Sequence, residues 1–343
     1  MFIRQINSQV NLGMNQVLRT STFFIVNCFV ACVAISALLT SSALAQVHGP
    51  GPSPASDFDT LINLPGDEAV ISGQEFETVG GIDGETTQLN VEHDGTIGSR
   101  FSALAGSEVN VCDGTVGARF RAEAGSEVNI ISGNVDSSFM ALNGSQVNIS
   151  GGNFGDSLEI GIGSEVNISG GNFSDLIADG PLNISGGTFN SLLQASSGSE
   201  VAISGGTFTS ISVNANSQIN IVGRQFLLDG EELDMLVPEE PFTITDRNVP
   251  LSGVLDDGQP FNFQLTTSFS IDGFFSSNAT VTLTLPLILG DVNRDGVVDF
   301  SDISPFIEIL ATGSFQAEAD IDQNDDVNFS DIAGFIGLLS GNN

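Results

Sequence analysis

Two segments near the C-terminus carry oxygen-bearing side chains at regular spacing. Residues 291–302 read DVNRDGVVDFSD, and residues 320–331 read DIDQNDDVNFSD. A calcium-binding loop offers carboxylate, amide and carbonyl oxygens at alternating positions of a tight turn and ends in an acidic residue at its twelfth position. The chemistry that these two segments indicate is therefore the coordination of a hard divalent cation.

The first segment has a ligand at each position of such a loop: Asp291, Asn293, Asp295, the Val297 carbonyl, Asp299 and Asp302. Gly296 stands at the sharp bend. The second segment supplies Asp320, Asp322, Asn324, the Asp326 carbonyl, Asn328 and Asp331. It has one carboxylate ligand fewer, and its bend residue is Asp325, a residue type that enters the left-handed region more readily than most. We therefore expect two Ca²⁺ sites, the second of lower affinity.

Each loop leads into an apolar segment with helical spacing. The first is followed by DISPFIEILATG and the second by DIAGFIGLLSG, and no helical pattern precedes either loop. Two such loop–helix units in tandem resemble the type I dockerin domain, over residues 287–343. The resemblance implies that calcium folds the segment and that two antiparallel helices pack together. It also implies binding to a cohesin-like domain on a surface scaffold protein, often to deliver polysaccharide-degrading enzymes.

The resemblance assigns a role to the tenth and eleventh loop positions, which help to select the cohesin. These residues are Phe300, Ser301, Phe329 and Ser330. Many members of the family carry two small polar residues there, so the phenylalanines imply an unusual partner. The alternative is an isolated calcium-stabilised fold without a partner.

Upstream of these loops the sequence repeats at intervals of about nineteen residues. Segments such as GSEVNI and GSQVNI place an apolar residue at Val109, Val128, Val147, Val166, Leu182, Val201 and Ile219. Seven positions later stand Val116, Val135, Phe154, Phe173, Phe189, Phe208 and Phe226. The apolar–polar–apolar triplets have the period of a strand with one buried face, and the Gly, Ser, Asn and Asp residues between them form turns. A regular repeat of this length predicts a solenoid.

We interpret the solenoid as a parallel β-helix whose interior is filled by columns of Val, Ile and Phe. It resembles the right-handed β-helices of secreted adhesins and polysaccharide lyases, and only that resemblance implies the handedness. The predicted fold class is therefore mainly β: a parallel β-helix with β-rich caps and a small all-α C-terminal domain.

Alternation along the triplets predicts two rows of outward polar side chains. One row is Glu108, Glu127, Gln146, Glu165, Glu200 and Gln218, and the other is Asn110, Asn129, Asn148, Asn167, Asn183 and Asn220. We favour a solvated face on which amide ladders add hydrogen bonds between coils. Direct glycan binding by this face, as in an adhesin, is the alternative, although the sequence has no Trp or Tyr for stacking on sugars.

Five charged residues of the solenoid are candidates for catalysis: Arg100, Arg119, Arg121, Asp113 and Asp136. The arginines follow the start of consecutive coils at similar spacing, so we expect them to gather at one corner of the solenoid. Such a corner can hold a carboxylate of an acidic polysaccharide, and an aspartate beside it can abstract a proton, as a lyase requires. Local ion pairs with neighbouring acids are the alternative that we favour.

Composition limits the partners. The formal net charge is −34, from 42 Asp and Glu against 8 basic residues, all of them arginine. So large an acidic excess argues against nucleic acid and anionic membranes as partners. Residues 1–45 differ from the rest: they hold Arg4 and Arg19, no acid, an apolar run and then Ala43-Leu44-Ala45. This is the pattern of a secretory signal peptide, with translation starting at Met1 or Met14.

The sequence therefore predicts an exported chain, extracellular or at a bacterial cell surface, with no membrane span after signal cleavage. Its expected divisions are 1–45 signal peptide, 46–85 linker and N-terminal cap, 86–226 β-helix, 227–286 β-rich cap and 287–343 dockerin-like domain. We expect a non-catalytic rod attached through the dockerin-like module to a polysaccharide-associated assembly. An enzyme carried by the same module, a polysaccharide lyase or glycoside hydrolase, is the alternative.

Overall fold

A computed structural model describes most of the chain after residue 86. It describes the backbone of residues 60–62, 68–72, 75–76, 80–82 and 87–92, and then residues 95–233, 235–270 and 273–340. The predicted signal peptide, residues 1–45, and residues 46–59 of the predicted linker and cap lie outside these ranges. Among the described residues, no helix is long and apolar enough to cross a membrane.

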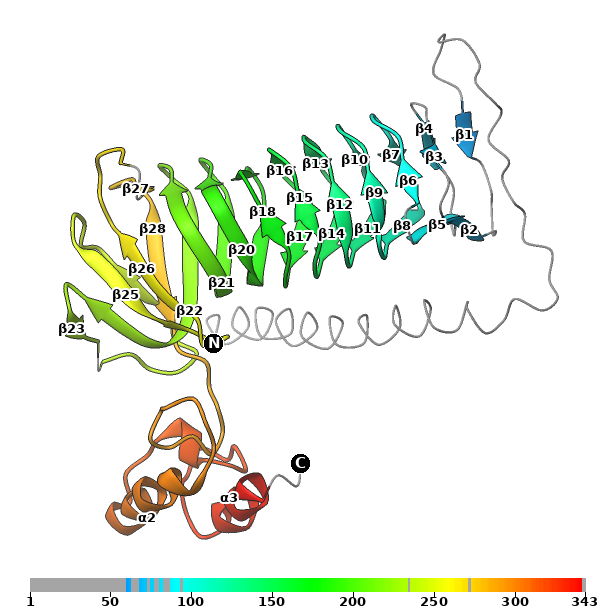
Figure 1. The fold of residues 1–343 in the computed structure, drawn as a ribbon. Helices are drawn as coiled ribbons and strands as arrows, with labels where there is room; N and C mark the ends of the chain where they lie inside the picture. Colours follow the sequence, from blue (N-terminus) through cyan, green and yellow to red (C-terminus); the bar gives the residue numbers. More distant parts are fainter. Residues whose placement is uncertain are drawn as a thin grey trace, which may run out of the picture.

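The main body is a β-solenoid in which each full turn contributes three strand segments (Figure 1). The first series is β5 (Thr87–Glu92), β8 (Ser107–Val111), β11 (Glu127–Ile130), β14 (Gln146–Ile149) and β17 (Glu165–Ile168). The second is β6 (Thr96–Ile97), β9 (Gly114–Val116), β12 (Gly133–Val135), β15 (Asn153–Phe154) and β18 (Asn172–Phe173). The third is β7 (Ser102–Ala103), β10 (Arg121–Ala122), β13 (Phe139–Ala141), β16 (Leu158–Ile160) and β19 (Leu176–Ala178). In β20 (Leu182–Ala195) and β21 (Glu200–Val213) the three segments run together as one strand.

Successive coils pair in parallel and in the register that the repeat predicts. Val128 pairs with Val109 on one side and with Val147 on the other, and Val166 pairs with Leu182. In the second series Phe173 pairs with Phe189. The predicted fold class, mainly β with a parallel β-solenoid, is therefore confirmed.

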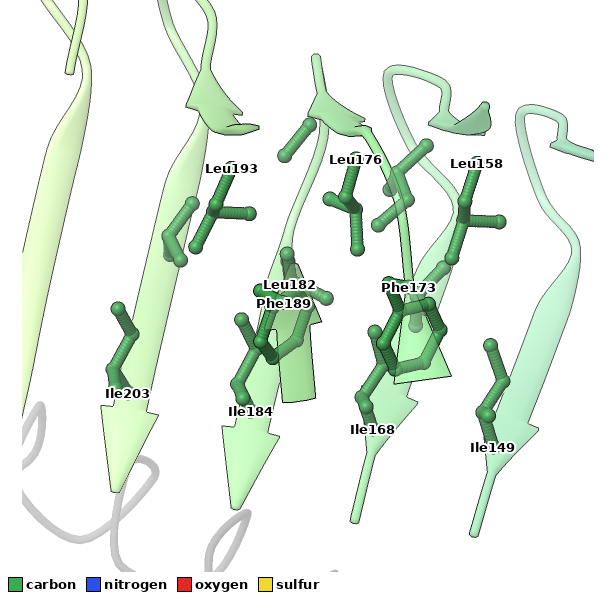
Figure 2. Packing of buried hydrophobic residues seen from close by; sticks show 14 of the residues in the cluster. Ile149, Leu158, Ile168, Phe173, Leu176, Leu182, Ile184, Phe189, Leu193 and Ile203 are labelled. Carbon is green, nitrogen blue, oxygen red and sulfur yellow. The ribbon is translucent and has the colours of Figure 1, made fainter. Parts of the chain in front are cut away.

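Phenylalanine rings stack along the interior in two columns. The predicted column runs through Phe154, Phe173, Phe189 and Phe208, with ring centroids 4.7, 4.9 and 4.8 Å apart. A second column, which was not predicted, runs through Phe101, Phe120 and Phe139, with ring centroids 5.8 and 5.1 Å apart. Figure 2 shows Phe173 and Phe189 between columns of Ile and Leu from neighbouring coils.

Strands at both ends of the repeat extend the solenoid. At the N-terminal end, β1 (Thr60–Ile62), β2 (Glu68–Ser72), β3 (Glu75–Phe76) and β4 (Gly80–Ile82) already pair in parallel with their neighbours, so the stack begins inside the segment expected to be linker and cap. At the other end, β22 (Gln218–Leu228) leads into an insertion of antiparallel strands: β23 (Glu231–Glu232), β24 (Phe242–Ile244), β25 (Pro250–Leu255) and β26 (Pro260–Gln264).

After the insertion the chain returns to the solenoid. Strand β27 (Gly273–Phe275) pairs in parallel with β21, and β28 (Thr280–Thr284) pairs in parallel with β22. Strand β24 then covers the outer edge of β28 with antiparallel hydrogen bonds. A hairpin turn at Asp257-Gly258 joins β25 and β26, with Gly258 at φ +86°. The end of the solenoid is thus closed by its own insertion, which removes an open sheet edge.

The C-terminal segment has a separate hydrophobic core. It contains η1 (Phe300–Asp302), α2 (Ile303–Thr312), η2 (Ala317–Ala319) and α3 (Asp331–Leu339). Phe306 of α2 and Phe335 of α3 stack with ring centroids 4.1 Å apart. Both rings lie four positions after the acidic residue that ends their loop, so the two loop–helix units pack through equivalent residues.

The position of a phenylalanine ring in the predicted column determines how much stability is lost when the ring is removed. Phe173 is fully buried between two rings, whereas Phe208 near the column's end is only partly buried. We expect Phe173→Ala to lower the free energy of unfolding by about 3–5 kcal/mol through the cavity it leaves, and Phe208→Ala to lower it by less. Guanidinium-induced unfolding of both variants checks this, and equal losses would contradict the ordering.

Candidate metal centre

The acidic residues that begin and end the first calcium-type loop are buried and held by backbone amides. Asp291 is 4 % exposed and Asp302 0 %. The Asp291 carboxylate accepts hydrogen bonds from the Gly296 amide at 2.8 Å and the Asp295 amide at 3.0 Å. The Asp302 carboxylate accepts from the Asn293 amide at 3.0 Å and from the Asp299 amide at 2.9 Å. The two carboxylates therefore fix the loop from opposite ends.

The second loop repeats this arrangement at equivalent residues. The Asp320 carboxylate accepts from the amides of Asn324 and Asp325, at 3.0 and 2.9 Å. The Asp331 carboxylate is 0 % exposed and accepts from the Asp322 amide at 3.1 Å and the Asn328 amide at 2.9 Å. Both loops therefore have the same backbone framework.

The two bends have the same backbone conformation despite their different residues. Gly296 has φ +87°, and Asp325, at the same position of the second loop, has φ +67°. Two positions earlier, Arg294 and Gln323 have φ +61° and +55°. An aspartate therefore takes the left-handed conformation in which a glycine was expected, and the second loop closes as the first does.

The donor set fits a calcium ion. Carboxylate oxygens of Asp320, Asp322 and Asp331 lie within 4.8 Å of one another, a spacing that a single ion can bridge. Hard oxygen ligands of this kind match Ca²⁺. Six ligand residues per loop stay our prediction: Asp291, Asn293, Asp295, Val297, Asp299 and Asp302 in the first, and Asp320, Asp322, Asn324, Asp326, Asn328 and Asp331 in the second.

Burial and hydrogen bonding shift the pKa values of two first-loop carboxyls in opposite directions. Burial raises the pKa of Asp291, and the neighbouring charge of Asp302 adds to the rise. Hydrogen bonds from the Ser301 hydroxyl and amide lower the pKa of Asp299. A divalent cation would favour the ionised form of Asp291 and so offset the cost of burying its charge.

The serines at the eleventh loop positions bond to the predicted ligands. Ser330 donates through its hydroxyl to Asp322 at 2.7 Å, and the Ser301 hydroxyl lies 3.4 Å from a carboxylate oxygen of Asp295. These residues therefore contact the loop itself, in addition to any role in choosing a partner.

An apolar pair is exposed on each loop–helix unit. Phe300 and Phe329, the tenth loop residues, are 79 % and 83 % exposed. Ile307 on α2 and Ile336 on α3 are 57 % and 58 % exposed and also occupy equivalent positions in the two units. The isoleucines were not among the residues predicted from the sequence, although the spacing of the two units is enough to find them.

The structure brings together only part of the arginine group. Arg100 and Arg119 occupy the same turn of successive coils, with φ +65° and +64°. Arg121 lies on β10 and pairs with Glu123 at 3.1 Å, which is the local pairing that we favoured. Asp136 follows β12 and accepts a hydrogen bond from the Ser137 amide at 2.7 Å. Asp113 lies between β8 and β9, at a different corner from the arginines.

Of the six asparagines predicted to point outward, Asn220 accepts hydrogen bonds from the Thr282 and Thr284 hydroxyls instead of joining a ladder. The other five form a continuous amide ladder, in which Asn110 and Asn129 are buried, at 4 % and 1 % exposure, rather than solvated. Each side chain donates to the one a coil before it, from Asn110 to Asn90 through Asn183 to Asn167, at distances of 2.9 to 3.1 Å. The predicted ladder is therefore present, and its amides bond to one another along the rod.

Comparison with protein families identifies the C-terminal units. Residues 289–339 match the family model of the dockerin type I domain. Searches among curated proteins and among solved structures gave no match. Dockerin domains in general bind calcium and cohesins, and this segment holds an aspartate cluster suited to a metal ion.

Removing the acidic residues that end the loops tests both predicted sites. We expect Asp302→Ala or Asp331→Ala to abolish calcium binding at its own loop, because each buried carboxylate also holds the loop's amides. Isothermal titration should then show one site in each single variant and none in the double variant, with Asp175→Ala on the solenoid as the control. Unchanged stoichiometry in both single variants would contradict the assignment.

Proposed function

Because residues 289–339 form a dockerin type I domain, we propose that this protein is a non-catalytic β-solenoid rod attached by calcium-dependent docking to an extracellular assembly. The dockerin domain and the solenoid together support the broader description, a protein attached to an extracellular or cell-surface assembly. The matched domain with its duplicated loops is the observation that carries the proposal. Its partner is a cohesin-like domain on a surface scaffold protein, in a setting rich in polysaccharide.

The exposed apolar pairs support the choice of docking surface. Phe300 with Ile307, and Phe329 with Ile336, present large apolar side chains to solvent on equivalent parts of the two units. Phenylalanine is among the residues enriched in protein interfaces, where a partner excludes water from such side chains. Ser301 and Ser330 adjoin the phenylalanines and complete the set that we propose for partner selection.

We also propose that the chain is exported and that it divides into the units predicted from its sequence. The sequence pattern of residues 1–45 supports a cleaved signal peptide. We propose the divisions 46–85, 86–226, 227–286 and 287–343 as working units, with the strands upstream of residue 86 and β27 and β28 belonging structurally to the solenoid.

A second candidate function is that the rod itself binds acidic polysaccharide. The shared turn of Arg100 and Arg119 is the feature that favours it, since two cations stand one coil apart. Catalysis at this corner has less support, because Arg121 is paired and Asp113 lies at another corner.

The two exposed phenylalanines are expected to contribute much of the affinity for a cohesin partner. We expect the double variant Phe300→Ala/Phe329→Ala to weaken binding to a type I cohesin domain by about 100-fold, as loss of an aromatic centre on each unit implies. Phe315→Ala, an exposed phenylalanine of the same domain outside both pairs, is the matched control. Titration calorimetry against a panel of cohesins in calcium measures this, and equal affinity of double variant and control would contradict the surface.

The rod itself is expected to be inactive on polysaccharides. Incubation of the full-length chain with uronate-rich polysaccharides should yield no unsaturated products by ultraviolet absorbance. Product formation that disappears in Arg119→Ala would contradict the non-catalytic rod and favour the alternative, an enzyme carried by its dockerin domain.

A further inference from the structure

The end of the solenoid contacts the outside of the first calcium loop. Arg224 lies on β22, and its Nη1 donates a hydrogen bond to the Gly296 carbonyl oxygen at 3.3 Å. Its Nε lies 3.6 Å from Oδ1 of Asp256, in the turn between β25 and β26. This Nε is buried and makes no hydrogen bond within the described part of the chain. One arginine therefore spans the solenoid's closing hairpin and the loop.

This contact lies at the bend, where the two loops carry different residues. A Cβ atom at Gly296 would lie 2.6 Å from Cδ and 2.7 Å from Nη1 of Arg224, which is too close. Asp325 shows that a side chain fits the same backbone conformation in the second loop. A residue larger than glycine at 296 would therefore displace the end of the Arg224 side chain from the carbonyl that it bonds.

A second difference lies on the same side of the first loop. Arg294, whose counterpart in the second loop is Gln323, places Nε 2.7 Å from the carboxylate of Glu318. Glu318 is 3 % exposed, and its carbonyl accepts a hydrogen bond from the Gly290 amide at 2.7 Å. A cavity of about 20 Å³ separates Arg224 from Arg294 and Glu318, room for about one water molecule.

The connection between the two parts is short and packed. Residues 285–290 join β28 to the first loop and are half-buried or buried. The Leu285 carbonyl accepts a hydrogen bond from the Glu239 amide at 2.9 Å. So few residues reach at most about 20 Å, which keeps the first loop beside the solenoid's end.

We propose that calcium in the first loop fixes the dockerin domain against the end of the solenoid, with Arg224 as the positioning residue. Asp291 and the Val297 carbonyl would hold the ion, and they stand on either side of Gly296, whose carbonyl Arg224 bonds. An ion in the loop therefore holds the acceptor of the contact in place. The rod then projects from its assembly in a set direction. This inference rests on the calcium binding in the proposed function.

Hydrogen exchange of the full-length chain, read by mass spectrometry, tests the contact. Wild type, Arg224→Ala and the control Arg121→Ala, which removes a half-exposed arginine elsewhere on the rod, are compared in calcium and in chelator. Peptides spanning 285–297 report the junction, those of α2 and α3 report the dockerin fold, and those of β20 and β21 report the solenoid.

In calcium we expect Arg224→Ala to speed exchange of 285–297 by about tenfold, as loss of a charge-assisted hydrogen bond implies, while the other peptides match wild type. In chelator the three proteins should exchange this segment equally. Arg224→Gln should change it in the same direction, which guards against a folding defect of the alanine variant.

Two results would overturn the inference and one would overturn its premise. Equal protection of 285–297 in Arg224→Ala and wild type with calcium shows that the Arg224 contact does not hold the junction in place. Slower exchange in wild type than in Arg224→Ala even in chelator shows that the contact does not depend on calcium. Protection of α2 and α3 that is the same in chelator and calcium removes calcium-dependent folding from the proposed function itself.

Discussion

The parallel register between successive coils is the constraint on which the rest of the structure depends. Up to β21, successive coils pair each strand with its counterpart one repeat away, so equivalent residues lie directly above one another. In β22 the segment that contains Phe226 pairs antiparallel with β25 instead, so Phe226 leaves the predicted column. In such a stack a side chain meets its own kind, which turns an asparagine at one position into the amide ladder and a phenylalanine into a ring column. The repeat in the sequence is thus the cause of both the apolar interior and the amide ladder.

That constraint also determines where the repeat can vary. The step from Val166 to Leu182 is shorter than its neighbours, yet the two residues pair directly, from β17 to β20. The seven-residue spacing from Val166 to Phe173 recurs from Leu182 to Phe189, so the missing residues come from the corners. Loss within a strand would turn its apolar side chains outward, whereas loss at a corner only tightens a turn.

The sequence predicted the features that recur at fixed spacing and missed those that depend on distant segments. The Val column and the Phe154 column followed from the triplets. The Phe101, Phe120 and Phe139 column recurs just as regularly, eight positions before each Val, and was open to the same reasoning. The return of β27 and β28 was not predictable, because an antiparallel insertion separates them from the strands they pair with.

The same division applies to the metal-binding segment. Ligand spacing, the bend residues and the equivalent exposed pairs can all be read along the chain, since each unit is local. The contact between Arg224 and Gly296 joins residues far apart in sequence, and no local pattern marks it. It meets the bend of the first loop, while Phe300 and Phe329 remain exposed on their own units. Contact with the rod therefore breaks the symmetry between the two loops without covering either apolar pair, so the rod contact and the proposed docking surface lie on different parts of one small domain.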